Sequence, residues 1–194
     1  MDIEFVRENY QRMPDAELVR VATEDSAGLT PEAQEIVKEE IQKRGLNKAI
    51  ISGVEAQNKS YTTKEIDHYC ELVRTLDCPM CGSAESPLNA TITSEVMSFI
   101  ILTQRTNKVK VACPGCLDKA NNRALTKTAV LGWWGVPWGI IRSVQAITRN
   151  ISSKRTNRAE GPNDTLRSYV LSRIGRLETY KGSTEKLQEI ISSE

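Results

Sequence analysis

Apolar residues in the N-terminal part of the chain recur at the spacing of α-helices. One stripe begins at Leu18 with i, i+3, i+4 spacing, and a second stripe follows Thr30. Thr30 is a favourable N-cap because proline and glutamate follow it, and Gly45 after a basic residue is typical of a helix end. Residues 1–58 are therefore predicted to form a helical hairpin region, with a turn or two of further helix in 47–57.

Three more helices are predicted from caps and apolar spacing. The first starts near Thr63 and leads to the middle of the chain. The second starts at Asp164, after a polar, basic stretch over 152–163 that is interpreted as a linker. The third is short and starts near Ser183. Helices therefore flank the central region on both sides.

Four of the five cysteines form two Cys-x-x-Cys pairs separated by 31 residues, and Pro and Gly turn residues accompany each pair. Such pairs make tight turns that aim two thiolates at one ion, as in tetrahedral zinc sites. Because four thiolates leave no position for water, one structural Zn²⁺ is predicted rather than a catalytic one. Two disulfides, unrelated thiols and rubredoxin-like iron are the alternatives. The predicted ligands are Cys78, Cys81, Cys113 and Cys116.

The remaining cysteine and the single histidine are not predicted to bind metal. Cys70 falls on the apolar stripe of the helix that starts near Thr63, which favours a buried core thiol. His68 falls on the polar face of the same helix, so an exposed surface position is expected.

Between the cysteine pairs the pattern becomes strand-like. Residues 90–103 are rich in β-branched and apolar types, the polar run 105–108 is predicted to be a turn, and 109–112 alternates on the way back. Such a hairpin would return the second cysteine pair to the first. The predicted fold class is α+β, with a small zinc-ribbon β-hairpin module embedded among α-helices.

We predict three regions along the chain. Residues 1–58 form the N-terminal helical hairpin region, 63–150 hold the zinc ribbon with a tryptophan-rich apolar segment, and 164–194 form the C-terminal helices. The polar residues between these ranges are interpreted as linkers.

Charge is distributed unevenly although the formal net charge is only +1. Residues 1–77 carry 10 basic and 16 acidic side chains, whereas 78–139 carry 6 and 3, and 140–181 carry 9 and 3. This asymmetry indicates that the two halves face different neighbours or face each other. The acidic N-terminus lacks the apolar stretch of a secretory signal, so a cytoplasmic location is expected, with a peripheral position at the inner membrane as an alternative.

The segment 128–141 contains no charged residue and includes all three tryptophans, Trp133, Trp134 and Trp138. In the favoured interpretation these indoles pack in a core or under a partner, while the glycines around them permit close approach. In the alternative they lie at the headgroup level of a membrane, beside basic residues that meet anionic lipid. The segment is too short and too interrupted to span a bilayer.

Several of these motifs together resemble an uncharacterised bacterial zinc-ribbon family. The resemblance covers about residues 72–150 and depends on the pattern of Cys78–Gly82, the strand Ser98–Thr103, Cys113–Cys116 and the GWWG-x-PWG segment Gly132–Gly139. It implies a zinc ribbon and proximity to a membrane. It implies no catalytic residues.

The sequence therefore favours a non-enzymatic structural-zinc protein that acts as a protein-interaction module and binds a partner, effector or toxin. A nucleic-acid-binding zinc ribbon is the alternative function, since basic residues are frequent over 105–181. No enzyme is predicted, because candidate acids such as Glu71 and Asp118 have no partner at a meaningful spacing.

Overall fold

The computed structural model describes residues 3–99, 102–134 and 138–193. The chain forms two compact units. Unit 1 combines Met1–Tyr69 with Val170–Leu187, and unit 2 combines Cys70–Tyr169 with Gln188–Glu194. The mixture of helices with one two-stranded antiparallel hairpin confirms the α+β class. The three regions expected from the sequence remain a prediction.

Unit 1 is helical. Its elements are α1 (Ile3–Arg12), α2 (Asp15–Arg20), a π-helical turn (Val21–Asp25), a 3-10 turn (Ser26–Gly28), α3 (Pro31–Lys43), α4 (Ala49–Gln57), the first part of α5 (Thr63–Arg74) and α9 (Ile174–Tyr180). The apolar stripes expected from the sequence form its core, which is built from Leu18, Ala22, Val37, Ile41, Ile50 and Val54.

The predicted boundaries of α3 are confirmed. The Thr30 side chain accepts a hydrogen bond from the backbone N–H of Ala33, and Gly45 has a φ of 67°, as a helix-ending glycine requires. Residues 47–57 contain α4. Helix α1 was not predicted, because none of its residues is buried and its apolar positions therefore carry no clear core-facing pattern.

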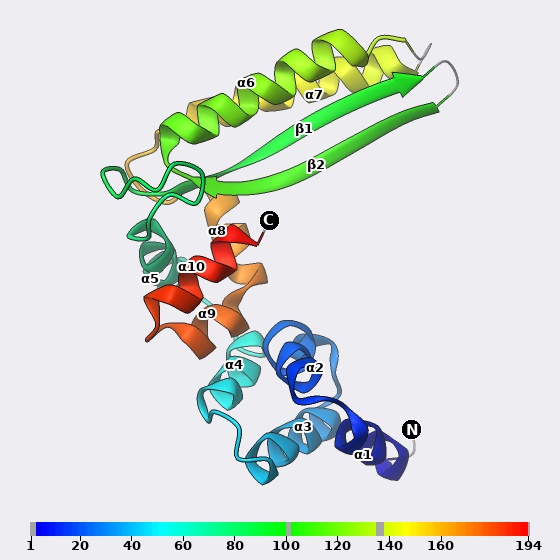
Figure 1. The fold of residues 1–194 in the computed structure, drawn as a ribbon, viewed down its shortest axis with the longest axis vertical. Coiled ribbons are helices and arrows are strands. Elements are labelled where there is room, and N and C mark those ends of the chain that lie inside the picture. Colours follow the sequence, from blue (N-terminus) through cyan, green and yellow to red (C-terminus); the bar gives the residue numbers. More distant parts are fainter. Residues whose placement is uncertain (1–2, 100–101, 135–137, 194) are drawn as a thin grey trace. The chain divides into compact units, whose positions relative to one another are not determined.

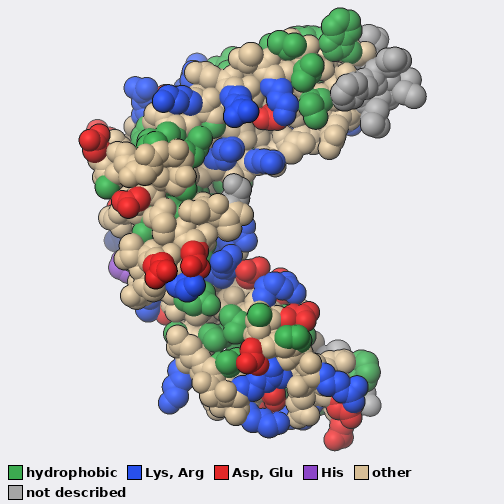
Figure 2. Space-filling view, viewed as in Figure 1, with side chains coloured by type: hydrophobic (Ala, Val, Ile, Leu, Met, Phe, Trp, Pro, Cys, Tyr) green, Lys and Arg blue, Asp and Glu red, His purple; other side chains and the backbone are tan. Residues whose placement is uncertain are grey.

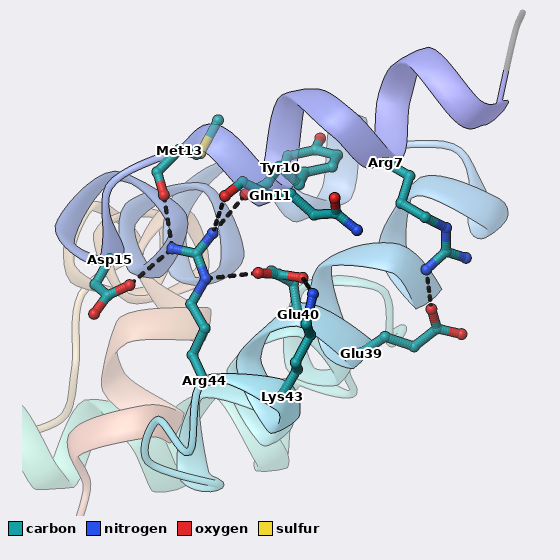
Figure 3. Close-up of polar contacts among 9 residues, drawn as sticks. All are labelled: Arg7, Tyr10, Gln11, Met13, Asp15, Glu39, Glu40, Lys43 and Arg44. Atoms are coloured by element: carbon teal, nitrogen blue, oxygen red, sulfur yellow. Dashed lines mark hydrogen bonds and ion pairs between the residues drawn. The ribbon is translucent and has the colours of Figure 1, made fainter.

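Arg44 joins the end of α3 to the end of α1. Figure 3 shows its guanidinium reaching across to the last turn of α1. Because the last carbonyls of a helix lack intrahelical donors, this cation satisfies groups that would otherwise need water. At 2.6 to 2.9 Å its nitrogens donate to the backbone carbonyls of Tyr10, Gln11 and Met13 and to the carboxylates of Asp15 and Glu40.

Arg44→Met is therefore expected to lower the thermal unfolding midpoint by several degrees. Methionine keeps part of the side-chain volume but has no nitrogen to donate to the five acceptors. Far-UV circular dichroism would measure the change. Arg12→Met is the matched control, since the Arg12 side chain is 79% exposed and, among the described residues, pairs with Glu8 on its own helix. Equal midpoints for the two variants would contradict the structural role of Arg44.

Unit 2 is a long β-hairpin with two long helices. Figure 1 shows α6 and α7 running along the hairpin, and both helices contact β1 and each other. The hairpin register pairs Asn89 with Ala112, which places the start of β1 beside the end of β2. The elements are β1 (Asn89–Phe99), β2 (Leu102–Ala112), α6 (Pro114–Leu131), α7 (Trp138–Thr156) and parts of α5, α8 (Asp164–Ser172) and α10 (Thr184–Ser192).

The turn of this hairpin was predicted in the wrong place. Residues 105–108 lie inside β2 and pair with β1, and the expected turn at this polar run does not form. The polar run is accommodated because three of its four partners on β1 are also polar, as in the pair Ser94 and Asn107, while Arg105 lies opposite Val96. The predicted linker 152–163 is also partly wrong, since α7 continues to Thr156.

The edge of β1 that faces away from β2 is covered by side chains of the two helices. The backbone N–H of Ser94 donates to Asn150 Oδ1 at 3.0 Å, and Asn150 Nδ2 donates to the Ser94 carbonyl at 2.7 Å. Thr128 Oγ1 accepts from the backbone N–H of Val96 at 3.1 Å. Since an unpaired strand edge needs partners when it is buried, these polar side chains replace a third strand.

Candidate metal centre

The first cysteine pair follows α5 and forms a tight turn. Gly82 has a φ of 71°, and its N–H donates to the Cys78 carbonyl at 2.8 Å. The N–H of Cys78 donates in turn to the Ser83 carbonyl at 3.0 Å. Because an L-residue with a side chain rarely adopts such a φ, glycine after the second cysteine lets the chain close around the two sulfurs.

The second cysteine pair opens α6. Cys113 is the N-cap residue, Pro114 occupies the first turn, and Cys116 is buried in that turn. The N–H of Leu117 donates to the Cys113 carbonyl at 3.0 Å. The N–H of Cys113 donates to Cys78 Sγ at 3.4 Å, which joins the two pairs directly. The hairpin thus returns the second pair to the first, as the sequence predicts.

The four sulfur atoms of Cys78, Cys81, Cys113 and Cys116 all lie within 4.8 Å of one another. Ligands about 2.3 Å from a zinc ion in a tetrahedron lie about 3.8 Å apart, and Cys81 Sγ and Cys113 Sγ are 3.8 Å apart. No disulfide joins any of the five cysteines. The cluster therefore has the ligand number and spacing of a tetrahedral metal site.

Burial and close neighbours shift the pKa values of three of these thiols. Burial raises the pKa of Cys116, and the three neighbouring sulfurs raise it further, to about 12. Burial likewise raises the pKa of Cys113. Burial acts in the same direction on Cys78, but backbone N–H groups that point to its sulfur outweigh it and lower the pKa to about 7. A divalent cation would stabilise all four thiolates at once.

The sequence predicts a buried core thiol at Cys70 and an exposed position for His68, and both predictions are confirmed. Cys70 is completely buried and does not belong to the four-sulfur cluster, and His68 is exposed. Among the described residues, no other group of three or more cysteine, histidine or acidic side chains is arranged to hold a metal ion.

The tryptophans do not form a core. Trp134 is 71% exposed and Trp138 is 61% exposed, so packing in a core is wrong, while contact with a partner or a membrane remains a prediction. Instead the neighbouring glycines bring the backbone close: a Cβ at Gly132 would collide with Ser143 Oγ, and a Cβ at Gly139 would lie 2.8 Å from the Gly132 carbonyl oxygen. Close approach was expected for these glycines, and it is confirmed.

None of the helices in the described part of the chain is both long enough and apolar enough to cross a membrane. Comparison with protein-family models, curated proteins and solved structures finds no match to this chain. The resemblance to a bacterial zinc-ribbon family therefore depends on the motifs alone.

Proposed function

We propose that this chain is a non-enzymatic interaction protein in which one structural Zn²⁺ holds together the base of unit 2. The single observation that carries the proposal is that unit 2 has a four-sulfur cluster at one end of its hairpin and an exposed apolar surface at the other. The cluster stabilises unit 2, and the apolar surface binds a partner.

Zinc is the metal that suits these ligands best. Thiolates are soft ligands, and four of them in a tetrahedron are typical of zinc or of iron–sulfur proteins. Cysteine-rich knuckles at the start of a helix and before a hairpin are the usual framework of structural zinc. Since four protein ligands complete the coordination, the ion has no position for a substrate or an activated water, which supports a structural role.

A binding role follows from the surface at the distal end of the hairpin. Trp134, Trp138 and Val130 are each more than 60% exposed, and single soluble domains rarely leave so many large apolar groups together in water. Covering this surface with a partner would remove the cost of its exposure. We therefore propose that the surface is occupied in the cell, at or near a membrane.

A basic groove supports nucleic-acid binding as a second candidate function. A groove of about 260 Å³ on β2 and α6 is lined by Lys108, Lys110 and Arg123, together with Lys127, which pairs with Glu95 at 2.5 Å. Phosphate groups are bound by such clusters. However, no aromatic side chain lines the groove, so it offers no stacking surface for bases.

The interaction role is tested by photo-crosslinking in cells. A benzoyl-phenylalanine introduced at Trp134 is expected to give a discrete adduct with a protein or lipid partner, and the adduct should be lost when Cys116→Ser removes a metal ligand. The matched control position is Phe5 in unit 1, an aromatic side chain that is 63% exposed. Absence of an adduct at Trp134, or equal adducts at both positions, would contradict the proposal.

A further inference from the structure

Two uncharged stretches meet at the distal end of unit 2. Residues 96–104 and 128–141 contain no charged side chain. They are held together by the Ser98 hydroxyl, which donates to the Gly132 carbonyl at 2.8 Å, and by the close approach of Gly139 to Ser98. The exposed apolar residues there, called the apolar end, are Val130, Leu131, Trp133, Trp134, Trp138, Ile140 and Ile141.

Beneath this surface the packing is polar. Thr128 and Ser143 are completely buried and Ser98 is 4% exposed, with one completely buried valine, Val96, at the base. Small residues and hydrogen-bonded hydroxyl and amide groups are the usual contacts between helices in lipid, where the outward surface is apolar. Water-soluble units show the opposite distribution, with apolar groups inside. This distal end therefore has the polarity pattern of a segment in contact with lipid.

Charged residues surround the base of the apolar end. Lys127 pairs with Glu95, Arg142 donates to the Thr103 carbonyl at 2.8 Å, and Arg105 lies opposite Val96 on the hairpin. Three of these four charged side chains are basic. Residues 89–158 as a whole carry eleven Lys and Arg and only two acidic residues, Glu95 and Asp118. Figure 2 shows Lys and Arg along this unit and hydrophobic side chains gathered toward its distal end.

The dimensions fit shallow insertion. From Val96, at the level of the charges, to Phe99 at the end of β1, the strand rises about 10 Å at roughly 3.3 Å per residue. Interfacial elements place their apolar face about 5–10 Å into the boundary between headgroups and acyl chains. Tryptophan is the residue enriched at this depth, and nearby basic residues meet anionic headgroups.

We infer that the apolar end inserts into one leaflet of an anionic membrane, with the basic residues at its base in contact with lipid phosphates. This inference rests on the interaction role proposed above and names the partner of the same surface. The lipid surface is favoured over a protein because the interior is polar, the surface is apolar and the surrounding charge is positive. The apolar surface is complementary to the acyl chains, and the positive charge is complementary to anionic headgroups.

The test uses the zinc-loaded full chain and vesicles of phosphatidylcholine with 30% phosphatidylglycerol or of phosphatidylcholine alone. The wild type is expected to sediment with the anionic vesicles at least about tenfold more strongly than with neutral ones, and salt should weaken the binding. Because all three tryptophans lie in this segment, their fluorescence should shift to the blue and be quenched by lipids brominated near the headgroup.

The double variant Trp134→Ser/Trp138→Ser is expected to lose about tenfold or more of the vesicle binding. Both side chains are exposed, so folding should be preserved, as circular dichroism and zinc content would verify. Phe5→Ser is the matched control and should bind like the wild type. No sedimentation of the wild type, equal binding by the double variant, or equal binding to both vesicle types would overturn the inference. A protein adduct at Trp134 without vesicle binding would overturn the lipid assignment and leave the interaction role supported.

Discussion

Removal of the metal is expected to unfold unit 2 and to leave the helices of unit 1 largely intact. Structural zinc contributes on the order of 10–16 kcal/mol of apparent binding free energy, which is comparable to the whole stability of a domain, about 5–15 kcal/mol. Without a cation, the four sulfurs would remain crowded together, and burial would keep the thiol pKa values of Cys113 and Cys116 raised. The base of the hairpin would then lose the contacts that hold β1, β2 and the start of α6 together.

A strong chelator and the variant Cys116→Ser provide two independent ways to remove the metal. Tryptophan fluorescence reports on unit 2 alone, because all three tryptophans lie within it, whereas far-UV circular dichroism reports on both units. Once the metal is removed, we expect tryptophan fluorescence to show no cooperative unfolding transition. Part of the helical circular dichroism signal should remain. Elemental analysis should find one zinc per chain in the wild type and none in Cys116→Ser.

Cys70→Ala is the control for this experiment, since Cys70 also lies in unit 2, is buried and is not a member of the cluster. It should retain one zinc and a chelator-sensitive transition. Identical unfolding curves with and without chelator, or full zinc content in Cys116→Ser, would show that the four sulfurs do not hold a stabilising ion.

The features that could be predicted from the sequence depend on local chemistry. The cap at Thr30 and the glycine at Gly45 act within a few residues of their own positions, and each Cys-x-x-Cys turn is equally local. The meeting of the two cysteine pairs could also be expected, because a hairpin between them leaves few other arrangements. These elements were therefore predicted correctly with their residues.

The features that could not be predicted depend on contacts between distant residues. The run 105–108 has the composition of a turn, and only its pairing with β1, mostly with polar residues, makes it a strand. Asparagine in the middle of a helix is ordinarily an unfavourable choice, so Asn150 gave no signal of its role at the strand edge. The sequence also left open whether Trp134 packs in a core or contacts a partner or membrane, because large apolar residues are usually expected inside and only the fold shows that this one is exposed.

Asn150→Leu is expected to destabilise unit 2 by about 3–5 kcal/mol. The Asn150 side chain is completely buried, and both bonds to the backbone of Ser94 would be lost. Each buried backbone group left without a partner costs about 1–3 kcal/mol, and leucine has a similar size, so the change isolates the hydrogen bonds. Asn121, which donates to Asn150 Oδ1 at 3.4 Å, would lose an acceptor as well.

Urea unfolding followed by tryptophan fluorescence would measure this loss in the zinc-loaded protein. The matched control is Asn122→Leu, because Asn122 is exposed on α6 and accepts a hydrogen bond from the Lys154 side chain at 2.9 Å, with no bond to a strand edge among the described residues. Its effect should stay within about 0.5 kcal/mol. If the two asparagine variants unfolded at the same urea concentration, the edge of β1 would not depend on the amide of Asn150. A large difference would show that polar helix side chains, acting in place of a third strand, keep the two-stranded hairpin attached to α6 and α7.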